Sequence, residues 1–134
     1  MYSPQETLDI VVTHLVNQGV PAVDRFGDCV YRKPLKNKTL KCAVGCLIPD
    51  EIYDTGMEGA AITYSPNFVR TINELGHSPY LCRELQKIHD KWWKVGFKID
   101  EKNRHLQNLS AWKKLEELAF RLDLELYTLD YYKD

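Results

Sequence analysis

The sequence lacks a long hydrophobic run and an excess of charge of either sign. Its 134 residues carry 18 Lys and Arg against 19 Asp and Glu, which gives a net charge of -1. No apolar stretch approaches the ~20 residues that cross a bilayer, so we expect no membrane segment. A protein that binds duplex nucleic acid neutralises many phosphates, and the balanced charge argues against that class. The length fits one globular domain, residues 1–134.

The four cysteines lack the spacing of a disulfide scaffold or a zinc ribbon. No Cys-x-x-Cys pair occurs, and the nearest two thiols, Cys42 and Cys46, are four residues apart. The start, MYSPQETLDI, is typical of a helix entry rather than of a charged and then apolar leader. We therefore expect reduced thiols, a cytoplasmic protein and no cofactor.

Three Ser-Pro dipeptides predict the starts of three helices, at residues 3–4, 65–66 and 78–79. In each case the hydroxyl can cap the first turn, and the proline ring suits the first helical position. The first helix also has a capping box with Glu6 and a closing Gly19.

The segment FGDCVYRKPLKNKTLKCAV, residues 26–44, predicts a β-hairpin, because two strand-like runs flank a cluster of Pro, Lys and Asn. A fourth helix is expected from Ser110, after a polar loop over 98–109. Alternating leucines predict a short strand or extended tail over 122–126, and we expect 127–134 to be disordered. The predicted fold class is therefore α+β, with three to four helices packed around a small hairpin.

The central segment KCAVGCLIPDEIYDTGMEG, residues 41–59, has a distinctive pattern together with YRKP at 31–34 and LQKIHD at 85–90. This pattern, a CAVG-LIPDE-Y-EG core with an LQ-IHD helix, resembles a largely uncharacterised family of small proteins from tailed bacteriophages and prophages. The resemblance spans most of residues 3–126. It implies a phage or prophage origin and the cytoplasm of a bacterial host, but no particular reaction.

Cys42, His89 and Asp90 are the candidate catalytic residues. Cys42 lies where a strand is expected to pass into a short helix, and a helix N-terminus favours a thiolate. His89 could serve as the base, oriented by Asp90. The apolar neighbours Leu40 and Ala43 are instead typical of a buried, inert thiol, so both interpretations stay open.

The same residue types could also form a zinc site. Cys42 and Cys46 could be joined by Cys82, His77 or His89 in a tetrahedral arrangement. Each of these cysteines also lies beside apolar residues, which is typical of packing in the core. Because no closely spaced ligand pair is present, we predict no metal site.

Four carboxylates, Asp50, Glu51, Asp54 and Glu58, fall within nine residues. Such a group repels itself unless a cation or ligand lies among its members, although some could simply favour a helix start or cap a turn. The spacing of a calcium loop is absent. We expect this acidic turn to meet the helix that carries His89 at a shared concavity.

The residues expected to bind a ligand combine these carboxylates with aromatic and basic side chains. Aromatic rings and arginine stack on planar ligands, and Lys87 belongs to a basic strip that could equally be a solvated helix face. The expected set is Tyr31, Arg32, Asp50, Glu51, Tyr53, Glu58, Lys87 and Trp93.

We expect a phage-encoded binding protein that blocks a host component, either a host defence protein or a small nucleotide-like ligand. One alternative is a small hydrolase or transferase that uses Cys42, His89 and the carboxylates. A second alternative is an assembly protein of the virus particle. The sequence leaves open whether the protein is an enzyme, and it leaves the oligomeric state open.

Overall fold

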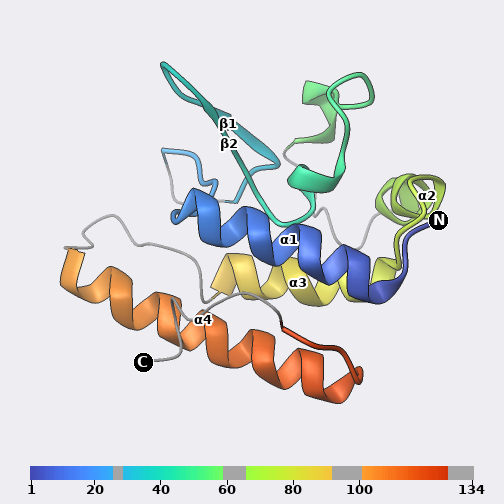
Figure 1. Ribbon diagram of the computed structural model, residues 1–134. Helices are drawn as coiled ribbons and strands as arrows, with labels where there is room; N and C mark the ends of the chain where they lie inside the picture. The colour runs from blue at the N-terminus through green and yellow to red at the C-terminus, as the bar shows by residue number, and fades with distance from the viewer. Residues whose placement is uncertain (26–28, 59–65, 92–100, 127–134) are drawn as a thin grey trace.

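The computed structural model describes residues 1–25, 29–58, 66–91 and 101–126, without the side chains of residues 91 and 101–110. Within these ranges it contains four α-helices, two short 3-10 turns and one antiparallel hairpin, so the α+β class predicted from the sequence is confirmed (Figure 1). The elements are α1 (Pro4–Gln18), β1 (Arg32–Pro34), β2 (Thr39–Lys41), η1 (Gly45–Leu47), η2 (Thr55–Met57), α2 (Pro66–Glu74), α3 (Pro79–Lys91) and α4 (Glu101–Arg121).

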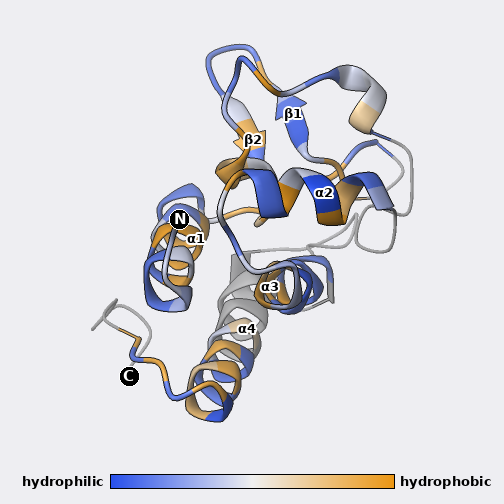
Figure 2. Cartoon of the chain, turned by 90° about the vertical axis from the view of Figure 1, so that its right-hand side faces the viewer, coloured by the Kyte–Doolittle hydropathy of each residue, from blue (hydrophilic) through white to orange (hydrophobic). Residues whose placement is uncertain are grey.

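Helix α3 lies at the centre of the fold and packs against α1, α2 and α4. Seen from the side, α1, α3 and α4 are viewed nearly end-on while α2 runs across them beneath the hairpin (Figure 2). The buried apolar residues of the helices belong to one cluster, and β1 and β2 project away from the helices in this view. The helices therefore enclose most of the core, and the hairpin and the two 3-10 turns cover one side of it.

Local capping sets the start and the end of α1, as the sequence predicted. The Ser3 hydroxyl accepts a hydrogen bond from the backbone N–H of Glu6, and the Glu6 carboxylate accepts one from the N–H of Ser3. Gly19 closes the helix at φ 73°. Ser78 caps α3 by accepting from the N–H of Leu81 at 3.3 Å, whereas Ser65 lies outside the described residues.

Helix α4 begins at Glu101, so the prediction that 98–109 forms a loop was wrong for residues 101–109. The segment is polar, but it contains neither proline nor glycine, and Glu, Lys, Arg, Gln and Leu are good helix formers. Polarity alone does not end a helix when no breaker is present.

The hairpin pairs Arg32 with Lys41 and Pro34 with Thr39, in the predicted segment. No strand forms over 122–126; Asp123 has a φ of 55°, and the backbone beyond it is irregular. The side chain of Gln5 binds both the N–H and the carbonyl of Glu125, which fixes this tail on α1. Residues 127–134 lie outside the described part of the chain. None of the helices described is long and apolar enough to span a bilayer.

Candidate functional site

The side chain of Arg32 gathers several of the residues that the sequence predicted to bind a ligand. Its guanidinium forms an ion pair of 2.7 Å with Asp50 and lies 4.3 Å from the centroid of the Tyr53 ring. It also donates to the carbonyl of Ile48 at 2.7 Å. Lys41 approaches the same Asp50 carboxylate at 3.8 Å. The cationic partner expected for the acidic turn is thus supplied from within the chain.

Glu58 is used in the same internal way. Its carboxylate accepts hydrogen bonds from the backbone N–H groups of Tyr31 and Arg32, at 2.8 and 3.0 Å, and from the Tyr53 hydroxyl at 2.7 Å. Burial, together with this bond to Glu58, raises the pKa of Tyr53 to about 12. Glu58 therefore fixes the backbone at the start of β1 and holds Tyr53 in place.

The other residues of the predicted binding set do not join this cluster. Glu51 is exposed, and no ion pair of its side chain occurs with any described residue. Lys87 is half-exposed on α3, where it pairs with Glu84 at 3.4 Å. Trp93 lies outside the described residues. Asp54 caps η2 by accepting from the N–H of Gly56, the alternative role foreseen for it.

His89 is fully buried on α3 and does not meet the acidic turn. Its Nδ1 lies 2.9 Å from Asp90 Oδ1, and its Nε2 accepts from the backbone N–H of Ala22 at 3.2 Å. Gln86, one turn earlier, donates to Asp90 at 2.6 Å and accepts from the N–H of Val44 at 3.0 Å. The LQ-IHD segment therefore anchors two loops to α3, and the contacts of His89 are separate from those of Asp50 and Glu58.

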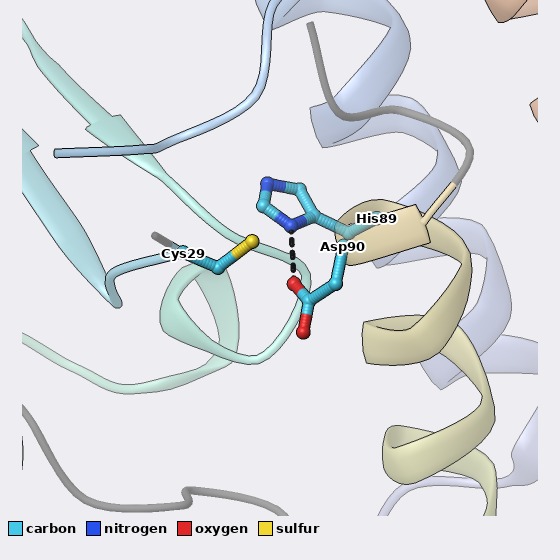
Figure 3. A group of neighbouring side chains, drawn as sticks. All are labelled: Cys29, His89 and Asp90. Atoms are coloured by element: carbon cyan, nitrogen blue, oxygen red, sulfur yellow. Dashed lines mark hydrogen bonds and ion pairs between the residues drawn. The ribbon is translucent and has the colours of Figure 1, made fainter. Parts of the chain in front are cut away.

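Cys29, rather than Cys42, is the thiol beside His89 and Asp90. Figure 3 shows its sulfur facing the Asp90 carboxylate and the Nδ1 side of the imidazole, and one potential ligand atom from each residue lies within 4.8 Å of the others. Burial alone would raise the pKa of Asp90, but hydrogen bonds from His89, Cys29 and Gln86 outweigh it and lower the pKa below its ordinary value.

The hydrogen bonds of His89 determine what this group can do. Since the N–H of Ala22 can only donate, Nε2 is an acceptor and the ring proton lies on Nδ1, directed at Asp90. Nε2 is therefore not free to take a proton from Cys29. A metal ion could bind Nδ1 only if that nitrogen lost its proton. The proton would then lie on Nε2 and would face the N–H of Ala22, which is also a donor. The arrangement suits a partly buried structural network better than a nucleophile and base pair or a metal site.

Cys42 is not placed as the predicted nucleophile. It is fully buried, its sulfur accepts from the N–H of Gly45 at 3.1 Å, and burial raises the pKa of the thiol far above its ordinary value. The helix expected to stabilise a thiolate is only the three-residue turn η1, too short to develop an appreciable dipole.

The zinc site that was weighed as an alternative, Cys42 and Cys46 with Cys82, His77 or His89, lacks the necessary geometry. In the described ranges, Cys29, His89 and Asp90 form the one group of three potential ligands close enough to share an ion. Burial raises the pKa of both Cys46 and Cys82 to about 12.

A cavity of about 500 Å³ lies between the η1–η2 region and α2. Its inner wall is mostly apolar and consists of buried side chains, with Tyr31 among them, whereas Asp54 before η2 and exposed or half-buried polar side chains of α2 lie around its mouth. The inner residues are Tyr31, Val44, Ile48, Phe68 and Ile72, with the half-buried Met57; the outer ones are Asp54, Gly56, Asn67, Arg70, Thr71 and Glu74.

Tyr31 was among the residues that the sequence predicted to bind a ligand, whereas the residues of α2 were not. Asn67, Arg70, Thr71 and Glu74 recur at spacings of three and four residues, so they share one face of a helix. This polar face was visible in the sequence. What the sequence did not reveal was that the face borders a cavity, because that depends on how α2 crosses η2.

The chain matches no family model, no curated protein and no solved structure. A functional assignment therefore depends on the geometry of the cavity and of the residues that shape it.

Proposed function

We propose that this chain is a phage-encoded binding protein of the bacterial cytoplasm that blocks a host component by holding part of it in the cavity between η2 and α2. The observation that carries the proposal is the cavity itself. Its volume, about 500 Å³, falls within the range of ~300–1,000 Å³ typical of ligand sites, and it combines an apolar wall with a few polar groups.

Binding is favoured over catalysis by what lines the cavity. Among the described residues that line it, none is a cysteine or a histidine. Among the described residues, the one group that resembles catalytic machinery, Cys29, His89 and Asp90, is tied up in internal hydrogen bonds. The hydrolase alternative through Cys42 would require a fully buried thiol of raised pKa to react.

The phage origin is proposed from the resemblance, and several residues of the resembling pattern shape the cavity wall. Gly45, from CAVG, lies so close to the Tyr31 carbonyl that a Cβ atom would collide with it. Glu58, from the EG end of the pattern, holds the Tyr31 backbone. Gln86 of the LQ-IHD helix holds the N–H of Val44. These residues of the pattern thus hold the shape of this wall and do not form a set of reacting groups.

Of the two host components expected from the sequence, a nucleotide-like ligand is the less favoured. Its phosphates need cations, and the described residues of the lining provide one guanidinium, Arg70, against two carboxylates, Asp54 and Glu74. Arg32 is committed to Asp50 and to the carbonyl of Ile48. The charge of the cavity favours insertion of a neutral or basic group, such as a side chain of a host defence protein.

The test is native mass spectrometry of the chain purified from bacterial cells, compared with two variants of α2. Thr71→Trp fills the mouth of the cavity, whereas Asn73→Trp adds the same ring to an exposed position of α2 outside the lining. We expect an additional bound mass on the wild-type chain and on Asn73→Trp, and none on Thr71→Trp. Equal occupancy in all three, or an unliganded wild-type chain, would contradict the proposal.

A further inference from the structure

We infer that the cavity recognises an apolar body that carries a hydrogen-bonding group at its inner end and a cationic group at its outer end, as in an aromatic amine or a basic side chain. This inference rests on the proposed function and specifies the chemistry that the cavity selects. Three features carry it: the inner hydroxyl, the apolar wall and the charge of the mouth.

The inner hydroxyl belongs to Tyr31. The residue is 5 % exposed and lines the cavity, and no hydrogen bond of its hydroxyl occurs with any described residue. The fully buried polar atoms without a hydrogen-bond partner do not include the Tyr31 hydroxyl oxygen. Part of the surface of this oxygen is therefore accessible. Burial and the nearby Cys42 and Glu58 raise the pKa of Tyr31, so the group is neutral and can both donate and accept. A ligand group that pairs with this accessible hydroxyl would replace its hydrogen bond to water and fix the orientation of the ligand.

The wall next to this hydroxyl is apolar. Val44, Ile48, Phe68 and Ile72 are all buried, and half-buried Met57 adds a flexible thioether. A planar or aliphatic body would bury its surface there, with a gain of roughly 25 cal/mol for each Å² of apolar area. A compact phosphate would leave this wall in contact with water.

The described part of the mouth is net negative. Among the described lining residues, Asp54 and Glu74 are exposed carboxylates and Arg70 is the one guanidinium, so two negative charges face one positive charge. Arg70 donates to Asn67 at 3.2 Å, and Glu74 has no ion-pair partner among the described residues. A cation at the mouth would therefore be attracted, and an anion would be repelled.

The probes are tyramine and 3-(4-hydroxyphenyl)propionate, which share a phenol and differ in the charge of the other end. Each is titrated into the full chain, and binding is followed through the backbone amide signals in two-dimensional ¹H–¹⁵N NMR spectra. We expect tyramine to shift the signals of Val44, Met57 and Ile72 and to bind about tenfold more tightly than the propionate.

Three variants test which side chains cause the preference for tyramine over the propionate. Tyr31→Phe removes only the hydroxyl and should weaken tyramine by about threefold to tenfold. Glu74→Gln should reduce the preference for tyramine over the propionate, whereas Glu116→Gln, an exposed carboxylate of α4 outside the lining, should leave it unchanged.

Equal affinity for the two probes, a preference for the propionate, or shifts that map outside the cavity would overturn the inference. If one of these results is found, but native mass spectrometry still detects a bound mass on the wild-type chain and none on Thr71→Trp, the inference fails and the proposed function stands. If tyramine binds as expected but the chain purified from cells carries no additional mass, the proposed function fails and the inference about the chemistry of the cavity stands. A bound mass that is a protein identifies a basic side chain as the source, and a small mass identifies a free amine.

Discussion

Gly45 lies where two backbone segments approach each other within the central pattern. A Cβ atom at this position would collide with the carbonyl oxygen of Tyr31 and would lie 3.3 Å from the sulfur of Cys42. Both neighbours are buried and have little room to move. The glycine is therefore required by close approach rather than by an unusual backbone angle.

Gly45→Ala should lower the free energy of unfolding by about 2–3 kcal/mol, because the clash is with backbone rather than with a flexible side chain. Urea denaturation followed by circular dichroism measures this. Gly56→Ala is the matched control, since a Cβ there meets only the Asp54 side chain, at 3.5 Å or more. Similar losses in the two variants would show that Gly45 is not specifically constrained.

The thiols can be distinguished by their reaction with iodoacetamide at pH 8. Cys42, Cys46 and Cys82 have raised pKa values because they are buried, so each should react at least about 100-fold more slowly in the native chain than in urea. Peptide mapping after timed labelling measures the rates. Rapid native labelling of Cys42 would revive its role as a nucleophile.

At the scale of elements, α3 holds the fold together through polar side chains as well as apolar ones. Gln86 binds the N–H of Val44, and His89 binds the N–H of Ala22. These two donors lie on loops that have no regular partner strand. Side chains of the central helix thus satisfy backbone groups that would otherwise be buried without a partner.

Gln86→Met should destabilise the chain by about 1–3 kcal/mol, because a side chain of similar size is kept while Val44 loses its acceptor and Asp90 loses a donor. Lys87→Met, one position further along α3, should change the free energy of unfolding by less than about 0.5 kcal/mol because Lys87 is exposed. Chemical denaturation of both variants tests this, and a neutral Gln86→Met would contradict an anchoring role.

The elements that the sequence predicted correctly depend on local signals. The cap at Ser3, the end at Gly19 and the hairpin turn are set by residues within a few positions of one another. The start of α4 at Glu101 was missed because a polar segment was taken for a loop although it contains no helix breaker.

The candidate site depended on contacts that are distant in the sequence, and these were harder to predict. The carboxylates were correctly expected to need a partner, and Arg32 provides it for Asp50. Cys42 was wrongly expected to lie beside His89, because the prediction relied on a helix N-terminus that is only a 3-10 turn, and the thiol that lies there, Cys29, was not considered. Which loop reaches α3 is decided by tertiary packing, which no local spacing reveals.

For the whole molecule, we can predict how stability depends on pH from two partly enclosed histidines. Burial lowers the pKa of His14, whose ring donates to the carbonyl of Lys41, and of His77, which hydrogen-bonds Thr7 at 2.6 Å. The unfolded chain, with histidine pKa values near 6.5, therefore binds protons that the folded chain does not. Stability should fall as the pH drops below about 6.5, by at most about 1.4 kcal/mol per pH unit for each histidine.

Urea denaturation at a series of pH values from 8 to 5 measures this slope. Asp90 should not contribute in that range, because its lowered pKa preserves its stabilising effect until the solution is more acidic. His77→Gln should make the slope shallower. A stability that is constant or that rises between pH 6.5 and 5 would contradict the assignment of neutral, enclosed histidines.

The central claim is that the cavity between η2 and α2, and not the group of Cys29, His89 and Asp90, is where this protein meets its partner. Two-dimensional NMR spectra of the ¹⁵N-labelled chain, recorded while an extract of bacterial cells is added, test it most directly. We expect the shifted signals to cluster on Val44, Met57, Thr71 and Ile72, and to be lost in Thr71→Trp. Shifts centred on Cys29 and His89 that persist in Thr71→Trp would contradict the claim.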